Sequence, residues 1–271
     1  MPELPEVETT RRGIAPHVVG RRVQAVRVRN RRLRRPVPAA LGRDLAGQVI
    51  EGVRRRGKYL ILDSSAGSVL IHLGMSGSLR LVSCREPPGP HDHVEFHFAG
   101  GRCLRLRDPR RFGLVLWTRR DPLYHPLLRG LGPEPLEPGF GGDYLFERAR
   151  GRRAAVKSFL MDGRVVAGVG NIYANEALFR AGIHPGRPAG RISRARYRRL
   201  ARALQEVLRE AIGAGGSTLR DFTNGEGQPG YFSHRFQVYG RAGAPCPRCG
   251  RPLHRRVLGQ RATYYCGRCQ R

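Results

Sequence analysis

The most specific chemical signal in the sequence is a set of four cysteines near its end. They form two C-x2-C pairs separated by sixteen residues: Cys246, Cys249, Cys266 and Cys269. Four thiolates at this spacing fit a tetrahedral zinc ion, and two such pairs across a hairpin form a zinc ribbon. Because four cysteines leave no coordination position for water, the predicted zinc is structural. Two disulfides, or two redox-active pairs, are the alternative.

The segment between the cysteine pairs is basic. It carries arginines suited to phosphate groups or to a minor groove: Arg255, Arg256 and Arg261. The other two cysteines, Cys84 and Cys103, lack this spacing, and we predict that they are packed thiols.

The start of the sequence offers a different chemistry. Methionine before proline is normally removed, which would leave Pro2 with a free secondary amine. An α-amine has a pKa of roughly 7.7–8.0, against about 10.4 for lysine, so a useful fraction is neutral at pH 7. Attack of this amine on a sugar C1′ would give an iminium, with Glu3 protonating the opened sugar and Lys58 transferring protons. A plain helix start at the surface, with acids favoured by the helix dipole, is the alternative.

Lysine is nearly absent from this basic chain. Lys58 and Lys157 are the only lysines among 50 basic residues. Arginine binds phosphate as lysine does, but it does not give up its proton to become an amine nucleophile or base. Each lysine is therefore a candidate for proton chemistry, and chance retention is the alternative for both.

Three glycine-flanked turns carry residues that could contact nucleic acid. The segment 168–174 presents backbone N–H groups and Asn171 at a predicted helix start, which suits a phosphate, although an ordinary turn between helices would look similar. The segments 72–77 and 108–113 expose Met75 and the pair Arg110 and Phe112. An apolar wedge beside an arginine can unstack a base and fill the gap. Core packing of the Met and Phe is the simpler reading of these segments taken alone.

The overall charge favours a polyanion partner. Lys and Arg number 50 against 21 Asp and Glu, which gives a formal net charge of +29. Such an excess gains affinity for nucleic acid by releasing counterions, although an arginine-rich proteome would also raise the count. No apolar run of about 18 residues is present, so no membrane span is predicted. The N-terminus is acidic and lacks the apolar core of a secretory signal, so the expected location is the cytoplasm.

The first half of the chain has the alternation typical of strands. Eight short strands predict an antiparallel sandwich or barrel: 22–28, 48–53, 58–63, 68–73, 78–82, 93–98, 103–107 and 113–117. A short helix over 3–14 precedes them. A Pro- and Gly-rich stretch at 131–139 reads as a linker, after which helices are predicted over 152–161, 171–181 and 193–211. Ser193 is the expected N-cap of the last helix, which ends at glycines 213–216.

Seven segments, in order along essentially the whole chain, resemble the formamidopyrimidine-DNA glycosylase family. They are Pro2–Thr9, Arg56–Tyr59, Leu73–Gly77, Asp108–Gly113, Gly168–Glu176, Pro229–Phe232 and the four-cysteine tail. The resemblance implies an α+β fold: an N-terminal antiparallel β-sandwich flanked by helices over 1–130, a helix–two-turn–helix domain over 131–235 and a zinc-ribbon finger over 236–271.

The resemblance also implies a role for each matching residue. Pro2 would form a Schiff base with C1′, Glu3 would donate a proton to the sugar, Lys58 would serve β-elimination, and Arg261 would support δ-elimination and hold phosphate. DNA contacts would come from His91, Arg110, Arg152 and Asn171, with Met75, Arg110 and Phe112 filling the space left by the flipped base. A loop from about Thr218 to Tyr231, with Glu6 near its base, would close over the lesion.

The implied function is excision of oxidised purines from duplex DNA, followed by nicking of the strand. One structural zinc ion is the only expected cofactor, and the chain is expected to act as a monomer on the bacterial nucleoid. Two alternatives remain at this stage: an endonuclease VIII-like enzyme for oxidised pyrimidines, and a DNA-binding zinc protein without catalytic activity.

Overall fold

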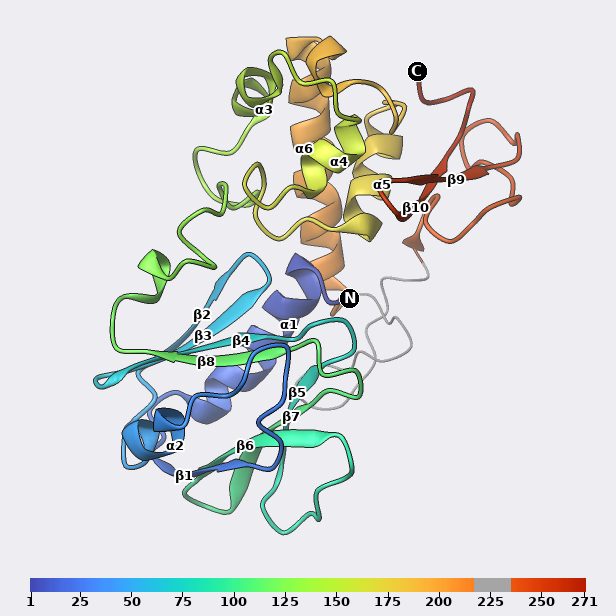
Figure 1. The fold of residues 1–271 in the computed structure, drawn as a ribbon. Coiled ribbons are helices and arrows are strands. Elements are labelled where there is room, and N and C mark those ends of the chain that lie inside the picture. The colour runs from blue at the N-terminus through green and yellow to red at the C-terminus, as the bar shows by residue number, and fades with distance from the viewer. Residues whose placement is uncertain (217–234) are drawn as a thin grey trace. The chain divides into compact units, whose positions relative to one another are not determined.

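The computed structural model describes residues 1–216 and 235–271 (Figure 1). They form two compact units. The first contains Met1–Arg129 and residues 214–216, and the second contains Gly130–Gly213 and residues 235–271. Within these described ranges, no helix has the length and apolar character needed to cross a membrane.

The first unit contains two antiparallel sheets of four strands (Figure 1). One sheet has the order β1-β6-β7-β5, with β1 at Val23–Val28, β5 at Ser78–Ser83, β6 at Asp92–Phe98 and β7 at Arg102–Arg107. The other has the order β2-β3-β4-β8, with β2 at Gly52–Arg56, β3 at Tyr59–Ser64, β4 at Gly67–His72 and β8 at Leu114–Thr118. The helices are α1 at Leu4–Val18 and α2 at Ala40–Leu45, followed by the 3-10 turn η1 at Pro122–Tyr124.

A single hydrophobic core joins both sheets to α1. Successive side chains of a strand point to opposite faces, and in β6 the apolar Val94, Phe96 and Phe98 belong to the core. The core also contains one face of α1: Val7, Ile14 and Val18. Truncating one of these large side chains, such as Phe96, to alanine would cost about 3–5 kcal/mol of stability.

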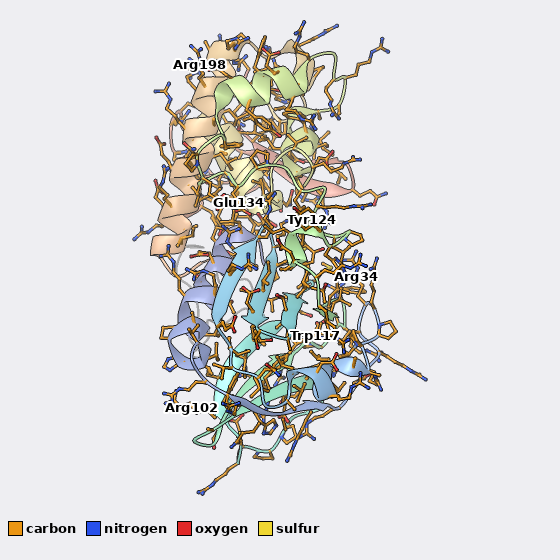
Figure 2. The ribbon with its side chains drawn as sticks, turned by 90° about the vertical axis from the view of Figure 1, so that its left-hand side faces the viewer. Arg34, Arg102, Trp117, Tyr124, Glu134 and Arg198 are labelled. Atoms are coloured by element: carbon orange, nitrogen blue, oxygen red, sulfur yellow. The ribbon has the colours of Figure 1, made fainter. Side chains whose placement is uncertain are left out.

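A polar contact fixes α2 to the second sheet. Trp117 of β8, labelled in Figure 2, donates from its indole nitrogen to the Asp44 carboxylate of α2 at 3.1 Å. The Arg119 guanidinium donates to the same carboxylate at 2.9 Å. The short helix is therefore held by its neighbours rather than by its own six residues.

The second unit is helical and ends in a two-stranded hairpin. Its elements are α3 at Gly142–Ala149, α4 at Val156–Met161, α5 at Asn171–Arg180, η2 at Ala189–Arg191, α6 at Arg194–Gly213, β9 at His254–Leu258 and β10 at Arg261–Tyr265. Helix α6 buries one side, on which α3 and α5 pack. The side chains predicted for that side are all buried: Leu200, Leu204, Val207, Leu208 and Ala211.

The predicted α+β class with antiparallel sheets is confirmed, and each of the eight expected strands has a counterpart. The strand expected over 48–53 is shifted, because β2 pairs Arg56 with Tyr59 and its turn therefore lies at Gly57 and Lys58. Helices α2 and α3 were not predicted. They have six and eight residues, which is too short for a clear helical period.

Candidate functional site

The N-terminal residues that carry the proposed chemistry are buried at the start of α1. Pro2 is buried, and Glu3 is 2% exposed. Glu3 is the N-cap, and its backbone N–H donates to the Glu6 carboxylate at 2.8 Å, as in a capping box. Pro5 fits the first turn because the missing N–H of a proline has no partner there in any helix. These contacts fix the backbone from which Pro2 and Glu3 project.

Glu6 also lies next to Gly216, the last described residue before the gap at 217–234. A Cβ added to Gly216 would lie 3.4 Å from Cγ of Glu6, and Gly216 has a φ of +84°. The prediction placed Glu6 at the base of a loop running from about Thr218 to Tyr231. Thr218 and Tyr231 lie outside the described residues.

Lys58 occupies the two-residue turn between β2 and β3. Gly57, its partner in the turn, has a φ of +57°, a conformation that glycine adopts without strain. The Arg55 guanidinium donates to the Gly57 carbonyl at 3.0 Å and pairs with the Glu8 carboxylate of α1 at 3.2 Å. The turn that carries Lys58 is therefore fastened to the helix that Pro2 and Glu3 precede.

Glu8 is buried, but its carboxylate stays charged. Burial by itself would raise the pKa of Glu8, but hydrogen bonds from Arg11 and Arg12 and the charges of Arg11 and Arg55 lower it to about 2. Sequence reasoning missed the pair of Glu8 and Arg55, because no local signal joins residues 47 positions apart.

His72 is an uncharged histidine beside Lys58. Burial is the largest cause that lowers the pKa of His72, and the charges of Lys58 and Arg34 lower it further, to about 4. Its Nδ1 accepts the Gly74 N–H at 2.9 Å, and its ring lies 4.8 Å from that of Tyr59. His72 thus starts the turn that presents Met75.

The two segments predicted to enter the DNA, 72–77 and 108–113, pack against each other, and we call them the wedge segments. A Cβ on Gly74 would lie 2.5 Å from the backbone carbonyl carbon of Phe112, so the turn around Met75 packs directly on the loop around Phe112. Phe112 is 44% exposed, and the Arg110 guanidinium stacks over its ring at 5.0 Å from the centroid. Arg110 and Phe112 therefore lie side by side, and their action together with Met75 in DNA stays a prediction.

Asp108 organises the wedge segments. It is fully buried and accepts hydrogen bonds from the Ser76 hydroxyl at 3.1 Å and from the Gly113 N–H at 2.7 Å. Its backbone N–H donates to the carbonyl of the half-buried His91 at 2.9 Å. Asp108 was part of a motif in the sequence, but only its buried carboxylate reveals that it positions its neighbours.

In the second unit, Asn171 and Lys157 both reach the β9–β10 hairpin. Asn171 is the first residue of α5, with Gly170 as N-cap, and its side-chain amide donates to the Ala262 carbonyl at 3.1 Å. Lys157 is 1% exposed, and its ammonium donates to the same carbonyl at 2.9 Å and to the Thr263 hydroxyl at 2.8 Å. Proton chemistry and chance retention were the two expectations for Lys157, and in this structure its ammonium donates to groups inside the protein.

Glu176 fastens the segment that enters the finger. Its buried carboxylate accepts the backbone N–H groups of Gln237, Val238 and Tyr239 at 2.8–3.0 Å. Three such donors satisfy a carboxylate that would otherwise be costly to bury. Glu176 belonged to a recognised motif, but its partners 61–63 residues away left no sequence signal.

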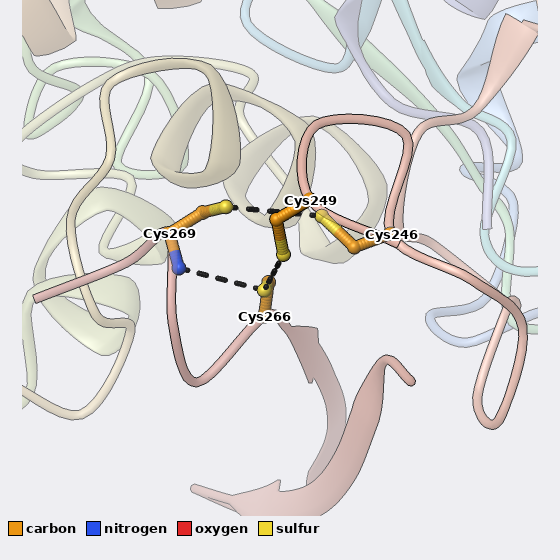
Figure 3. A group of neighbouring side chains, drawn as sticks. All are labelled: Cys246, Cys249, Cys266 and Cys269. Carbon is orange, nitrogen blue, oxygen red and sulfur yellow. Dashed lines mark hydrogen bonds between the residues drawn. The ribbon is translucent and has the colours of Figure 1, made fainter. Parts of the chain in front are cut away.

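The four predicted zinc ligands lie together (Figure 3). Two sulfur pairs connect the first C-x2-C pair with the second, at 3.9 Å for Cys246 and Cys269 and 3.5 Å for Cys249 and Cys266. Tetrahedral zinc with Zn–S bonds of about 2.3 Å has sulfur–sulfur edges of about 3.8 Å. These separations exceed the roughly 2.05 Å of a disulfide, so the residues fit zinc and the disulfide alternative does not apply.

A second group of possible metal ligands lies in the first unit, but its carboxylate is paired with arginines. Glu95, His97 and Cys103 lie close together and are buried. However, the Glu95 oxygens already accept Arg105 at 2.7 Å and Arg29 at 3.0 Å. Burial raises the pKa of Cys103 to about 12, so it is a packed thiol, as predicted.

The remaining predicted DNA contacts are exposed. Arg152 precedes α4, and Arg261 begins β10 after a tight turn in which Gly259 and Gln260 have φ of +54° and +60°. Positive φ at both central residues is typical of a type I′ hairpin turn. Arg261 is thus presented at the end of a rigid hairpin.

Three family models match successive parts of the chain. The N-terminal domain of formamidopyrimidine-DNA glycosylase matches residues 1–115, its H2TH domain matches residues 131–223, and the zinc finger found in FPG and IleRS matches residues 243–271.

Full-length relatives and solved structures agree with these matches. The formamidopyrimidine-DNA glycosylase of Methylococcus capsulatus is 63% identical over 271 residues, which cover both chains completely. A Lactococcus lactis FPG mutant, solved in complex with DNA containing Fapy-dG, has a TM-score of 0.93 and 33% identity, with 100% of each chain covered. MutM solved with DNA containing carbocyclic 8-oxo-G has a TM-score of 0.92 and 34% identity, also with 100% of each chain covered.

Proposed function

Because the chain belongs to the formamidopyrimidine-DNA glycosylase family, we propose that it excises oxidised purines with Pro2 as its nucleophile. Its activity is that of a DNA glycosylase and AP lyase in base excision repair. The relatives solved with Fapy-dG and with 8-oxo-G DNA support the purine lesions as substrates over oxidised pyrimidines. We place the reaction on the DNA of the bacterial nucleoid.

The first step is recognition. Arginines on both units hold the phosphate backbone, and extrusion of the damaged nucleotide costs a few kcal/mol of unstacking. Met75, Arg110 and Phe112 fill the vacated space, with Arg110 facing the orphaned cytosine. The packing of the Gly74 turn on the Phe112 backbone supports this role, because it lets both segments enter the DNA as one rigid wedge. His91, Arg152 and Asn171 add backbone contacts, and Glu6, Thr218 and Tyr231 contact the lesion.

The second step is base release. In the structure Met1 precedes Pro2, so the proline nitrogen is an amide, and removal of Met1 creates the reactive amine. The amine attacks C1′ as the C1′–N bond to the base breaks, and the base leaves with a proton. Glu3 protonates the ring oxygen as the sugar opens, which leaves an iminium between Pro2 and C1′.

The third step is strand cleavage. The iminium acidifies the C2′ proton, and its removal, assisted by Lys58, expels the 3′ phosphate by β-elimination. A second elimination, supported by Arg261, expels the 5′ phosphate. Hydrolysis of the iminium then frees Pro2 and the sugar fragment. Zinc at Cys246, Cys249, Cys266 and Cys269 stabilises the finger that carries Arg261.

One observation carries the proposal: Arg55 ties the Lys58 turn to Glu8 on α1, the helix that Pro2 and Glu3 precede. The test uses purified protein, a duplex with 8-oxoguanine opposite cytosine, and borohydride to reduce the iminium. We expect a covalent adduct that mass spectrometry maps to Pro2. An adduct on Lys58 would overturn the assignment of the nucleophile. Binding without adduct or nick would favour the DNA-binding protein without catalytic activity.

A further inference from the structure

The second unit contains a basic pocket of about 670 Å³ to which the proposed mechanism gives no role. The loop after α5 and the second cysteine knuckle line it. Its ionisable side chains are all cationic or basic: His184, Arg187, Arg191, Arg256 and Arg271. No carboxylate side chain lines the pocket.

The arginines of this pocket have no acidic partner in residues 1–216 and 235–271. The ion pairs of the unit involve other arginines, such as Arg180, Arg194 and Arg198. The Nε donor of Arg256 is buried and has no hydrogen-bond partner among the described atoms. The positive charge of the pocket arginines is therefore not neutralised by carboxylates of the described residues and can attract an anionic ligand.

The pocket is built to hold the Arg256 guanidinium in place. A Cβ at residue 186 would collide with Nη2 of Arg256, so the guanidinium packs where only glycine leaves room. It also lies over the Tyr265 ring at 5.6 Å. The Gly186 N–H donates to Nδ1 of His184 at 3.2 Å, which leaves the Nε2–H of the neutral ring as a further donor. The main-chain oxygen of Arg271 already accepts from Arg196 and His184.

The hairpin register relates this pocket to Arg261. Arg256 lies opposite Thr263, and Arg261 lies opposite Leu258, so both arginines belong to the same face of the hairpin. They are diagonal neighbours on the two strands, so their Cα atoms lie roughly 7–8 Å apart, close to the axial rise of two nucleotides of one DNA strand, about 7 Å. Guanidinium groups match phosphate oxygens with two parallel hydrogen bonds.

We infer that this pocket binds the phosphodiester backbone of DNA flanking the lesion, which extends the site at Arg261 toward Arg187 and Arg191. The inference rests on the proposed function, because DNA is the ligand. The stretch of DNA beyond the phosphate at Arg261 would then add to the binding affinity without contributing to the chemistry at Pro2.

The test compares two duplexes that each contain one 8-oxoguanine: a long duplex of 30 base pairs with the lesion at its centre, and a short duplex in which only two base pairs lie on the 5′ side of the lesion, beyond the phosphate that Arg261 is proposed to hold. Binding of R187Q/R191Q is measured as a function of salt, beside the matched control R148Q/R209Q, which removes two exposed arginines outside the pocket. We expect the salt slope of log K on the long duplex to fall by about 2 in R187Q/R191Q, with affinity reduced on the order of 10-fold. The short duplex should be bound and nicked as by wild type.

An unchanged slope, or an equal loss in the control, would overturn the inference. An equal loss on both duplexes would also overturn it, because the contact would then lie at the lesion. The variant R256Q provides a second test, in which the zinc content shows that the finger is still folded. If R256Q keeps its zinc and loses affinity only for the long duplex, the proposed site is supported. If it keeps both its zinc and its full affinity, the proposed site is contradicted. If wild type nicks neither duplex, the proposed function fails separately.

Discussion

The Ser76 hydroxyl donates to Oδ1 of Asp108 at 3.1 Å, across 32 positions of sequence. The other carboxylate oxygen accepts the Gly113 N–H at 2.7 Å. Met75 comes just before Ser76, and Phe112 comes just before Gly113. One buried carboxylate therefore connects the two turns that extend from the paired ends of β4 and β8, where His72 lies opposite Leu114.

Replacing Asp108 with alanine should separate lesion recognition from strand cleavage. The change leaves two buried donors without an acceptor, so we expect the free energy of unfolding to fall by about 2–4 kcal/mol. Excision of 8-oxoguanine should fall on the order of 100-fold, because a displaced wedge cannot hold the base out of the stack. Nicking of a duplex that already contains an abasic site should fall far less.

Ser76→Ala is the matched control for this prediction, since it removes one donor and leaves the Gly113 bond intact. Its loss of activity should be small. Equal losses on the 8-oxoguanine and abasic duplexes in Asp108→Ala would contradict a role in the wedge.

Glu8→Gln should remove part of the acid sensitivity of the protein. The pKa of Glu8 is about 2 in the folded protein, below its ordinary value of 4.5. The stabilisation is therefore complete above about 4.5 and is lost as pH falls toward 2, and we estimate it at about 2 kcal/mol. Urea unfolding at pH 7 and at pH 3 should show a smaller difference for Glu8→Gln than for wild type. An identical pH dependence would show that the ion pair with Arg55 does not stabilise the fold.

The sequence predicted local features of this site better than long-range ones. The cysteine spacing predicted the zinc ligands, because the geometry of four thiolates depends on two short knuckles. Alternation predicted the strands because it is a property of neighbouring residues. The pairings of Glu8 with Arg55 and of Glu176 with three backbone N–H groups depend on how distant segments pack, and no periodic pattern encodes them.

Lys58 should influence the titration of His72. Burial, followed by the positive charges of Lys58 and Arg34, lowers the pKa of His72 to about 4 from its ordinary 6.5. Lys58→Met removes one of these charges, so the pKa of His72 should rise. NMR of the ring protons as a function of pH measures this directly, and an unchanged pKa would mean that Lys58 lies too far away to act.

The low pKa of His72 also makes the stability of the protein depend on pH. In the unfolded chain His72 gains its proton below about 6.5, but the folded protein resists protonation until about 4. Stability should therefore fall as pH drops from 6.5 to 4, by up to about 3 kcal/mol. A His72→Phe variant should lose this part of the pH dependence, although it also loses the acceptor for the Gly74 N–H.

Lys157→Arg should impair the finger while leaving base excision largely intact. The ammonium fits a site that is 1% exposed and donates to the Ala262 carbonyl and the Thr263 hydroxyl. A guanidinium is larger and planar, so forcing it into this space should cost about 1–3 kcal/mol. Because Ala262 follows Arg261, the hairpin should shift and the δ-elimination product should decrease relative to the β-elimination product. Gel analysis of the nicked ends measures this ratio, and zinc content shows whether the finger stays folded. The exposed Arg153→Lys, which exchanges the same residue types in the opposite direction, should behave as wild type. An unchanged product ratio in Lys157→Arg with full zinc would mean that Lys157 does not position Arg261.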